Sequence, residues 1–394
     1  MVVNELLKTR TRQGLPSDLS YWRDKTGQEV DIVLEREGQP RPVEIKSGHG
    51  MRGFSEDGEP APLSYLFPML RSLLLPVLML PTVLSAQVST LPAMMYGDTT
   101  RKGVPFSKDP HVVAFGGRYL LYYTLPAHSD KNHPVKGLGI GIAESTDLTR
   151  WRKVGEITPA GDPETNGIAA PCALVIGRQV HLFYQTYGNG RKDAICHAVS
   201  DDGLAFRRNP TNPVFRPTGD WNCGRAIDAE VFPMGDRYLL YFATRDTAYK
   251  VQLQGVASAP LNSNFNRDQW TQLTDAPILK PEYPWEGQCV EGASIVRKGN
   301  TLYMFYAGAY NNNPQQIGVA KSSDGIRWQR LSNKPFLANG DPGSWNASES
   351  GHPHLFQDSD GRTWLFYQGN NDNGKTWYLS NREVLWNEQG PYLR

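Results

Sequence analysis

Residues 107–124 read SKDPHVVAFGGRYLLYYT, which is a short apolar strand, a Gly-Gly turn and an aromatic strand. The same phrase returns four more times, as CALVIGRQVHLFYQ (172–185), EVFPMGDRYLLYFA (230–243), ASIVRKGNTLYMFYA (293–307) and HLFQDSDGRTWLFYQ (354–368). The copies recur about every 60 residues, a period typical of radial or solenoid repeats. One residue leads each copy, and the five leading residues are Asp109, Ala170, Asp228, Glu291 and His352. If each copy is one structural unit, these five residues share one location.

A second pattern follows three of the copies and indicates a hairpin between a third and a fourth strand. It reads Ser-x-Asp-x-x-x-aromatic, from Ser145 to Trp151, from Ser200 to Phe206 and from Ser322 to Trp328. Short polar residues favour the turn, and the aromatic residue covers the hairpin. Four strands in each of five copies predict an all-β fold, a five-bladed β-propeller whose blades surround a central channel. Because only a short segment follows His352, we expect a strand from residues 88–106 to complete the last blade.

The composition is that of a turn-rich, aromatic-rich β protein. The chain has 394 residues, with 38 Gly, 29 Pro, ten Trp and 18 Tyr. Its net charge is +1, from 41 basic and 40 acidic residues, so no long-range field favours nucleic acid or an anionic membrane surface. We therefore expect an uncharged partner. The four cysteines lack the close spacing of a metal site, and their pairing is left open.

Residues 1–68 differ in composition from the repeats and form a separate fragment. A strand-like stretch, Glu29 to Leu34, is followed by Val43-Glu44-Ile45-Lys46. An acidic residue followed by Glu-x-Lys is an arrangement with which nucleases hold a divalent metal. The segment from Tyr21 to Gly48 resembles the C-terminal, nuclease-like end of bacterial ATPases that carry a domain of unknown function, which implies a small α/β-like fragment. The alternative is two amphipathic strands with solvated charges, and we do not expect residues 1–68 to belong to the native protein.

Residues 69–86, MLRSLLLPVLMLPTVLSA, have the features of a secretory signal peptide. They begin with Met, carry one basic residue, continue with an apolar run too short to span a bilayer comfortably, and end in small residues. We therefore expect translation to begin naturally at Met69 and the mature domain, residues 87–394, to be periplasmic or secreted, with no stable membrane span. The alternative is a buried apolar helix between two domains. Pro76 and Pro81 disfavour it, because each removes a helix hydrogen bond.

The leading residues are the candidate site. In a propeller the first strand of each blade lines the channel, so its first residue lies at one mouth of that channel. Three leading residues, Asp109, Asp228 and Glu291, are carboxylates that repel one another, which raises at least one pKa and keeps one acid protonated near neutral pH. One acid that protonates a leaving oxygen and one carboxylate that activates water suit glycoside hydrolysis. In inverting enzymes the two lie roughly 6.5–9.5 Å apart.

From about residue 100 to its end, the chain resembles the five-bladed glycosidases of glycoside hydrolase family 43 and its relatives. The resemblance implies that Asp109 in Lys-Asp-Pro is the general base and that Glu291 in Val-Glu-Gly-Ala is the general acid. It implies that Asp228 in Ile-Asp-Ala-Glu-Val-Phe tunes the pKa of the acid and orients substrate. It also implies that His352 in Ser-Gly-His lies beneath the site or helps to hold a central cation. A structural calcium ion in the channel is therefore a candidate, although no cofactor is required.

Several polar side chains lie close to the leading residues in sequence. Glu230, two residues after Asp228 on the same strand face, is expected to be a structural hydrogen-bonding residue and is the alternative modulator. Glu349 and His354 flank His352 and are expected to line the channel without taking part in chemistry.

Aromatic and cationic side chains near the ring are candidate substrate-binding residues. Trp221, Trp285 and Trp345 each precede a leading residue by six or seven positions, which places them on loops at the rim of the same mouth. Aromatic faces suit stacking on sugar CH groups, so we predict that they bind substrate, with packing between blades as the alternative. Arg225 is predicted to hydrogen-bond substrate or to pair with an acid.

The preferred hypothesis is an exported glycoside hydrolase that cleaves arabinofuranosides, xylosides or similar sugars of polysaccharide-derived oligosaccharides with inversion. A non-catalytic carbohydrate-binding propeller is the first alternative, which the presence of all three acids disfavours. A retaining fructan hydrolase is the second, although such relatives carry Asn-Asp-Pro-Asn and Arg-Asp-Pro where this chain has Lys-Asp-Pro-His and Ile-Asp-Ala. A nuclease that depends on residues 1–68 is the third. The sequence leaves the sugar, exo or endo action and the oligomeric state open.

Overall fold

The computed structural model describes residues 19–23, 29–36, 39–43 and 93–393. The chain forms two compact units, Met1–Leu84 and Ser85–Arg394. In the first unit, β1 (Leu19–Arg23), β2 (Glu29–Arg36) and β3 (Gln39–Val43) pair antiparallel in that order. The strand predicted at Glu29–Leu34 is therefore present. The predicted carboxylate at position 44 and the apolar segment 69–86 lie outside the described residues, so the nuclease and signal-peptide hypotheses stay predictions.

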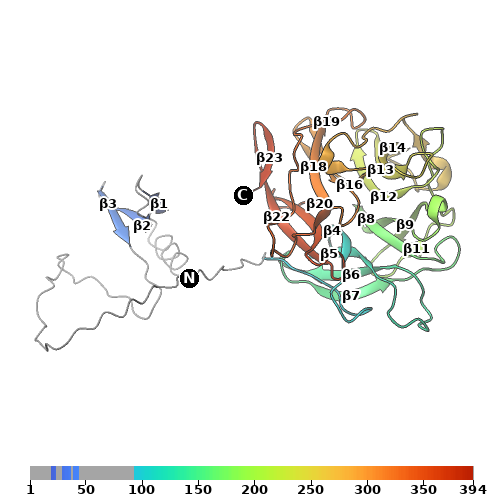
Figure 1. Cartoon of the computed structure of the whole chain (residues 1–394), viewed down its shortest axis with the longest axis horizontal. Helices are drawn as coiled ribbons and strands as arrows, with labels where there is room; N and C mark the ends of the chain where they lie inside the picture. The colour runs from blue at the N-terminus through green and yellow to red at the C-terminus, as the bar shows by residue number, and fades with distance from the viewer. Residues whose placement is uncertain (1–18, 24–28, 37–38, 44–92, 394) are drawn as a thin grey trace, which may run out of the picture. The chain divides into compact units, whose positions relative to one another are not determined.

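The second unit consists of five four-stranded antiparallel sheets that surround a common centre (Figure 1). This confirms the prediction of an all-β, five-bladed propeller. Blade 1 contains β4 (Lys108–Phe115), β5 (Arg118–Leu125), β6 (Gly139–Ser145) and β7 (Arg152–Ile157). Blade 2 contains β8 (Ile168–Ile176), β9 (Gln179–Thr186), β10 (Ile195–Ser200) and β11 (Arg207–Arg208). Blade 3 contains β12 (Ile227–Met234), β13 (Arg237–Arg245), β14 (Gln252–Pro260) and β15 (Thr271–Gln272).

Blades 4 and 5 continue the pattern, and each blade begins at the centre with the strand that opens a sequence repeat. Blade 4 contains β16 (Val290–Lys298), β17 (Thr301–Gly308), β18 (Gln316–Ser322) and β19 (Gln329–Arg330). Blade 5 contains β20 (Glu349–Gln357), β21 (Thr363–Asn370), β22 (Tyr378–Asn387) and β23 (Gly390–Leu393). Three short 3-10 helices, η1 (Gly190–Lys192), η2 (Arg267–Gln269) and η3 (Pro284–Glu286), lie in the connections.

The predicted Ser-x-Asp turn closes the hairpin between the third and fourth strands. In blade 1 the Ser145 hydroxyl oxygen accepts the Leu148 amide at 3.0 Å, and Oδ1 of Asp147 accepts the Thr149 amide at 2.9 Å. Short side chains that replace backbone partners stabilise such turns without a regular ladder. The same bonds recur from Ser200 in blade 2 and from Ser322 in blade 4.

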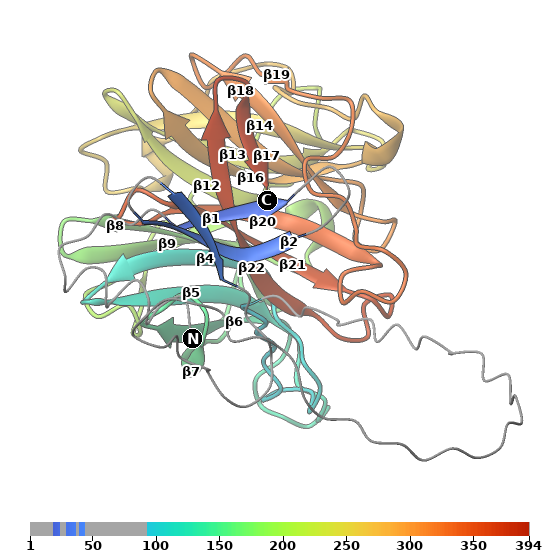
Figure 2. The ribbon, with the colours of Figure 1, turned by 90° about the vertical axis from the view of Figure 1, so that its left-hand side faces the viewer.

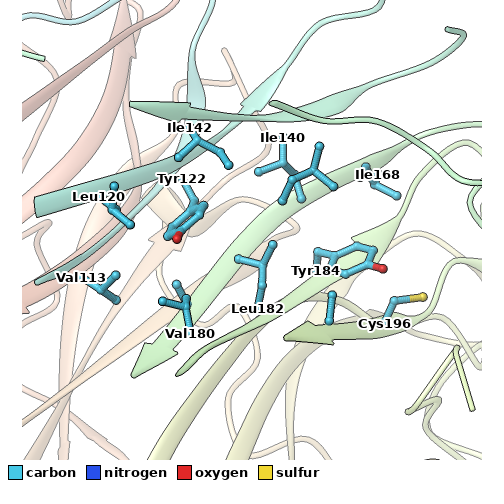
Figure 3. Close-up of a cluster of buried hydrophobic side chains, with 13 residues drawn as sticks. Val113, Leu120, Tyr122, Ile140, Ile142, Ile168, Val180, Leu182, Tyr184 and Cys196 are labelled. Atoms are coloured by element: carbon cyan, nitrogen blue, oxygen red, sulfur yellow. The ribbon is translucent and has the colours of Figure 1, made fainter. Parts of the chain in front are cut away.

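Apolar side chains fill the space between neighbouring blades. Figure 3 shows the cluster between blades 1 and 2, in which Ile142 and Leu120 of blade 1 face Leu182 and Val180 of blade 2. Full burial of each such aliphatic side chain contributes on the order of 1.5–3 kcal/mol. Four further clusters join the other pairs of adjacent blades, blade 5 to blade 1 included. The packing between blades therefore fixes where the inner strands stand around the centre.

The propeller closes by a different arrangement from the one predicted. Blade 5 obtains its fourth strand from its own C-terminal end, β23, so residues 88–106 are not needed for it. The described part of that segment instead adds a short bridge, in which Tyr96 and Leu379 exchange backbone hydrogen bonds of 2.9 and 2.8 Å. Met94 of the same segment packs in the core between blades 5 and 1. Figure 2 shows β20 and β22 of blade 5 beside β4 of blade 1, where this closure occurs.

Two further expectations concern covalent and membrane features. The thiols at positions 172, 196, 223 and 289 are all free, so the cysteine pairing left open by the sequence does not occur. Within the described ranges, no helix has the length and apolar character needed to cross a membrane.

Candidate active site

A β-bulge interrupts every inner strand near its start. In β4, Lys108 pairs with Thr124 and His111 with Tyr122, so one strand carries an extra residue. The same shift occurs in β8, β12, β16 and β20. The first bulged residue of each blade has a positive φ, namely Asp109 (51°), Ala170 (46°), Asp228 (51°), Gly292 (57°) and His352 (45°). This conformation is costly for residues other than glycine, so its repetition marks a place that the surrounding structure constrains strongly.

Side chains of the preceding blade hold three of these strained residues by their backbone amides. The amide of Asp109 donates to Gln368 Oε1 at 2.9 Å, that of Ala170 to Thr124 Oγ1 at 2.8 Å and that of Asp228 to Gln185 Oε1 at 2.7 Å. Each acceptor belongs to the second strand of the blade before. The geometry of the ring therefore depends on how neighbouring blades pack.

Glu291 does not occupy the position predicted for it. The equivalent of Asp109 in blade 4 is Gly292, and Glu291 is equivalent to Lys108, one residue earlier in the strand. The prediction that Glu291 is one of five equivalent leading residues is therefore wrong by one position. Glycine takes the strained place because it adopts a positive φ without a steric cost. The five equivalent residues are Asp, Ala, Asp, Gly and His in blade order.

His352 lies between two ring carboxylates. Its Nε2 atom is 3.5 Å from Oδ1 of Asp228 and 3.7 Å from Oδ1 of Asp109. Burial opposes a charged imidazole, but the two carboxylates outweigh burial and raise the pKa of His352 to about 9. Burial alone would raise the pKa of Asp109, but the positive charges of His352 and Lys108 outweigh burial and hold the pKa of this carboxyl below its ordinary value. Asp109 is therefore ionised at neutral pH.

Glu291 reaches the same site and has the opposite electrostatic environment. Gln315 Nε2 donates to its Oε1 at 2.7 Å, and Gln252 Nε2 donates to its Oε2. Arg245 orients Gln252, since its Nε donates to Gln252 Oε1 at 3.1 Å. Burial, followed by the negative charge of Asp228, raises the pKa of Glu291. The site thus contains one carboxyl that ionises readily and another that keeps its proton to higher pH.

Lys108 brings a cation to the same site. Its Nζ donates to Oδ1 of Asn311 at 2.7 Å and lies 4.6 Å from the ring centroid of Trp377. Burial opposes the charge, but Asp109 and then Glu349 raise the pKa of the Lys108 ammonium. The lysine therefore stays charged among the acids.

Two or three residues farther along the inner strands, side chains and amides meet around Glu230. Its Oε1 accepts from the Ser294 hydroxyl at 3.1 Å and the Ile295 amide at 2.9 Å, and its Oε2 lies 3.2 Å from His111 Nε2 and 3.6 Å from the Cys172 thiol. Burial raises the pKa of Glu230. These contacts link blades 1 to 4. Glu230 therefore has the partners expected of a structural hydrogen-bonding residue.

The trio of His111, Cys172 and Glu230 has the donor types of a metal site, and its ligand atoms lie within 4.8 Å of one another. The hydrogen bonds indicate otherwise. Nδ1 of His111 accepts the Ala173 amide at 3.2 Å, and burial lowers the pKa of His111 to about 3, so the ring is neutral with its proton on Nε2. A metal on Nε2 would require that proton on Nδ1, against the Ala173 N–H. The trio is therefore a buried hydrogen-bonded cluster in the channel.

A calcium ion bound directly to His352 is not favoured by the donor types, because calcium prefers oxygen ligands and Nε2 of His352 faces Asp109 and Asp228. The imidazolium itself supplies positive charge between the two acids. A channel calcium held through water stays a prediction.

The three tryptophans predicted to bind substrate pack on glycines of their own blades. Trp221 lies against Gly255, Trp285 against Gly308 and Gly318, and Trp345 against Gly369. A Cβ atom added at Gly369 would lie only 2.7 Å from the Trp345 ring, so the glycine makes room for the indole. Each indole is partly exposed, and stacking on a sugar stays a prediction. Trp345 also lines a cavity of 760 Å³, whose lining includes none of the ring acids.

The remaining predicted residues have internal partners. Arg225 is buried, and its Nε donates to Oδ2 of Asp193 at 3.4 Å, so pairing with an acid is the role that the structure shows. His354 lies in the channel, where its Nε2 donates to the Val112 carbonyl at 3.1 Å and its ring contacts that of His111, with centroids 3.7 Å apart and the ring planes tilted by 36°.

The sequence did not reveal the amide side chains around the acids. Gln252 and Gln315 lie outside the repeated phrase, and nothing in their sequence positions marks them. Gln185 and Gln368 did carry a signal, because each ends its copy of the phrase as Phe-Tyr-Gln. Lys108 carried one too, since it precedes Asp-Pro at the position that Glu291 has before Gly-Ala.

Two family models match the chain. The model described as "Glycosyl hydrolases family 43" matches residues 103–388, which include the whole ring. The model described as "Domain of unknown function (DUF4143)" matches residues 1–57, in agreement with the resemblance stated for the N-terminal fragment.

Individual relatives agree with the first match. A β-1,2-mannobiose phosphorylase of Thermoanaerobacter sp. (strain X514) is 29% identical over 134 residues, which are 30% of this chain and 42% of that protein. The chain thus spans less than half of this relative. A thermostable family-43 glycoside hydrolase is 20% identical with a TM-score of 0.59, over 76% of this chain and 96% of that one. An α-L-arabinofuranosidase from Lactobacillus brevis is 17% identical with a TM-score of 0.56, over 72% and 93%.

Proposed function

Because the chain belongs to the glycosyl hydrolases of family 43, we propose that it hydrolyses arabinofuranosides, xylosides or similar terminal sugars with inversion at the anomeric carbon. Asp109 is the general base, Glu291 the general acid and Asp228 the group that keeps Glu291 protonated. His352 keeps Asp109 ionised.

Each step of the reaction has a group suited to it. Asp109 takes a proton from water as the water oxygen attacks the anomeric carbon. Glu291 gives its proton to the glycosidic oxygen as the bond from that oxygen to the anomeric carbon breaks. The base ends protonated and the acid ionised, and exchange of both with solvent restores the resting state. One sugar leaves with a new hydroxyl on the opposite face.

One observation carries this proposal: the pKa of Asp109 is lowered while that of Glu291 is raised, within one site. Two carboxyl groups whose environments separate their pKa values are how enzymes obtain a base and an acid at one pH. A binding site without activity has no need of this separation. The non-catalytic propeller is therefore the weaker hypothesis.

The substrate class rests on access and on relatives. Asp109 and Asp228 are 7% exposed and Glu291 8%, so little of each acid is open to solvent, and we expect the end of a sugar chain to reach them more readily than its middle. One solved structure with the same fold is named as an arabinofuranosidase and another as an endo-1,4-β-xylanase. Both names support a pentose, and the arabinofuranosidase name supports a terminal one.

The direct test is a panel of nitrophenyl glycosides assayed with the full chain. We expect release of nitrophenol from the arabinofuranoside or the xyloside, and loss of it in Asp109→Asn with the fold intact by circular dichroism. Equal rates for this variant and the wild type would contradict the role of Asp109. No release from any pentoside would contradict the substrate class.

A second candidate is phosphorolysis, which the similarity to a mannobiose phosphorylase supports. In that reaction phosphate replaces water as the attacking group. Phosphate needs no base, whereas water does, and the ionised Asp109 supplies one, so the ring favours hydrolysis. Inorganic phosphate added to the assay distinguishes the two, since phosphorolysis yields a sugar phosphate and requires phosphate for turnover.

A further inference from the structure

Glu349 is a fully buried carboxylate at the start of β20, and the proposed reaction does not use it. Its Oε1 accepts from Asn311 Nδ2 and from Gln368 Nε2, both at 3.0 Å, and its Oε2 accepts from the Asn312 amide at 2.6 Å. All three partners donate N–H groups. The carboxylate is thus an acceptor on both oxygens, and the side chains of two of its partners lead to the ring.

Gln368 connects Glu349 with the base. Its Oε1 accepts the backbone amide of Asp109 at 2.9 Å. A backbone amide can only donate, so the NH₂ group of Gln368 must point the other way, toward Glu349. The acceptor at Glu349 therefore selects the one orientation of Gln368 that holds Asp109 at its φ of 51°.

Asn311 connects Glu349 with the acid. Its Oδ1 accepts from the Lys108 ammonium at 2.7 Å, so its NH₂ group faces Glu349 and also donates to Gln315 Oε1 at 3.2 Å. With its oxygen facing Asn311, Gln315 turns its NH₂ group toward Glu291, to which it donates at 2.7 Å, and toward the Ala309 carbonyl, to which it donates at 3.0 Å. The side-chain amides of Gln368, Asn311 and Gln315 are therefore each oriented by at least one partner that can only donate or only accept.

We propose that Glu349 is a positioning residue that orients the base and the acid together, through Gln368 on one side and through Asn311 and Gln315 on the other. This inference rests on the proposed function for its kinetic consequence, but its structural consequence can be measured without substrate. Glu349 touches neither the sugar nor the reacting atoms.

The charge of Glu349 is consistent with this role. Burial is the main cause that raises its pKa to about 7, while the Asn312 amide and Lys108 act in the opposite direction. Glu291 is the acidic group that acts on it from blade 4. Near neutral pH a substantial fraction of Glu349 is ionised, the form that accepts hydrogen bonds on both oxygens.

The chain offers an internal control for the base side. The amide of Asp228 donates to Gln185 Oε1 at 2.7 Å in the same way that Asp109 donates to Gln368, but it is not linked to Glu349 by any bond described above. If Glu349 acts locally, its replacement must accelerate hydrogen exchange at the Asp109 amide and leave exchange at the Asp228 amide unchanged. A general loss of stability must accelerate exchange at both amides.

The test is hydrogen exchange of these two amides in the full chain, measured for the wild type, Glu349→Leu and Glu349→Gln. We expect exchange at Asp109 to accelerate about tenfold in Glu349→Leu, the effect of losing one hydrogen bond, with exchange at Asp228 unchanged. Glu349→Gln keeps one acceptor and gives a smaller acceleration. Glu286→Gln is the matched control, because Glu286 is an equally buried, hydrogen-bonded carboxyl outside the ring, and it leaves both amides unchanged.

Two results overturn the proposal. One is unchanged exchange at Asp109 in a folded Glu349→Leu, and the other is equal acceleration at both amides. If Glu349→Leu does not fold, the same comparison is made with Glu349→Gln. Where a pentoside is cleaved, the proposal also requires that kcat falls about tenfold in Glu349→Leu with KM little changed. An accelerated Asp109 amide without any hydrolysis by the wild type would leave the positioning network standing and contradict the proposed reaction instead.

Discussion

Nε2 of His352 lies 3.7 Å from Oδ1 of Asp109, so an imidazolium stands beside the group proposed to activate water. Removing this charge in His352→Asn must raise the pKa of Asp109. We expect the acidic limb of the kcat/KM profile to move about 1 pH unit upward, at the lower end of what a neighbouring opposite charge produces. The basic limb serves as the reference. An unmoved acidic limb would show that His352 does not set the charge of the base.

The same ion pairs predict how stability depends on pH. The pKa of His352 in the folded protein is about 9, above its ordinary value of 6.5, so the stabilisation is complete below pH 6.5 and is lost as the pH rises through 9. We expect the melting temperatures of the wild type and His352→Asn to differ most at pH 6. The difference should shrink by roughly 5 °C by pH 10, the size of a change of a few kcal/mol. A difference that is constant over this range contradicts the prediction.

The role of Glu291 as an acid predicts a dependence on the leaving group. Glu291→Gln cannot protonate the glycosidic oxygen, so hydrolysis of a substrate with a poor leaving group should fall by ~10²–10⁴. A dinitrophenyl glycoside needs no proton and should be cleaved at close to the wild-type rate. Asp109→Asn provides the contrast, because loss of the base slows both substrates alike. Equal losses on both substrates in Glu291→Gln would remove Glu291 from the role of acid.

Gln252 is predicted to tune the acid. In Gln252→Leu, Oε2 of Glu291 loses an N–H donor that favours its ionised form, so the pKa of Glu291 rises and the basic limb moves to higher pH by up to about 1 unit. Gln254→Leu is the control, because the Gln254 side chain is equally buried and has no hydrogen-bond partner in the described part of the chain. It should leave the profile unchanged. A shift of the same size in both variants would mean that Gln252 acts only through packing.

Glu230 is predicted to act on stability and not on the acid. Glu230→Ala leaves buried donors of His111, Ser294 and Ile295 without an acceptor, at a cost of about 3 kcal/mol in the free energy of unfolding. Urea denaturation measures this loss. The basic limb of the profile should not move, whereas a modulator at this position would shift it.

The fold could be predicted from the sequence because its signals are local. The period of the repeats, the apolar strands and the Ser-x-Asp turns each lie within a few residues, and all three are present as predicted. The closure of the ring was predicted less well, because residues after Asn370 form two strands, β22 and β23, that pair locally in blade 5 but lie outside the repeated phrase.

The candidate site could be predicted only where its residues follow the repeat. Asp109, Asp228 and His352 follow the repeat and occupy equivalent places, whereas Glu291 is displaced by one residue because the backbone angle at Gly292, not the acid, marks the bulge. The amides of Gln252 and Gln315 were missed because they meet Glu291 only through the fold. The orientation of Trp345 depends on the absence of a side chain at Gly369, which lies outside its own loop.

Inversion at the anomeric carbon can be checked by proton NMR of the first sugar released. With the pentoside that the panel identifies, we expect the anomer opposite to that of the substrate to appear first and mutarotation then to produce the other. First appearance of the substrate's own anomer would contradict it, because Asp109 would then act as a nucleophile and not as a base.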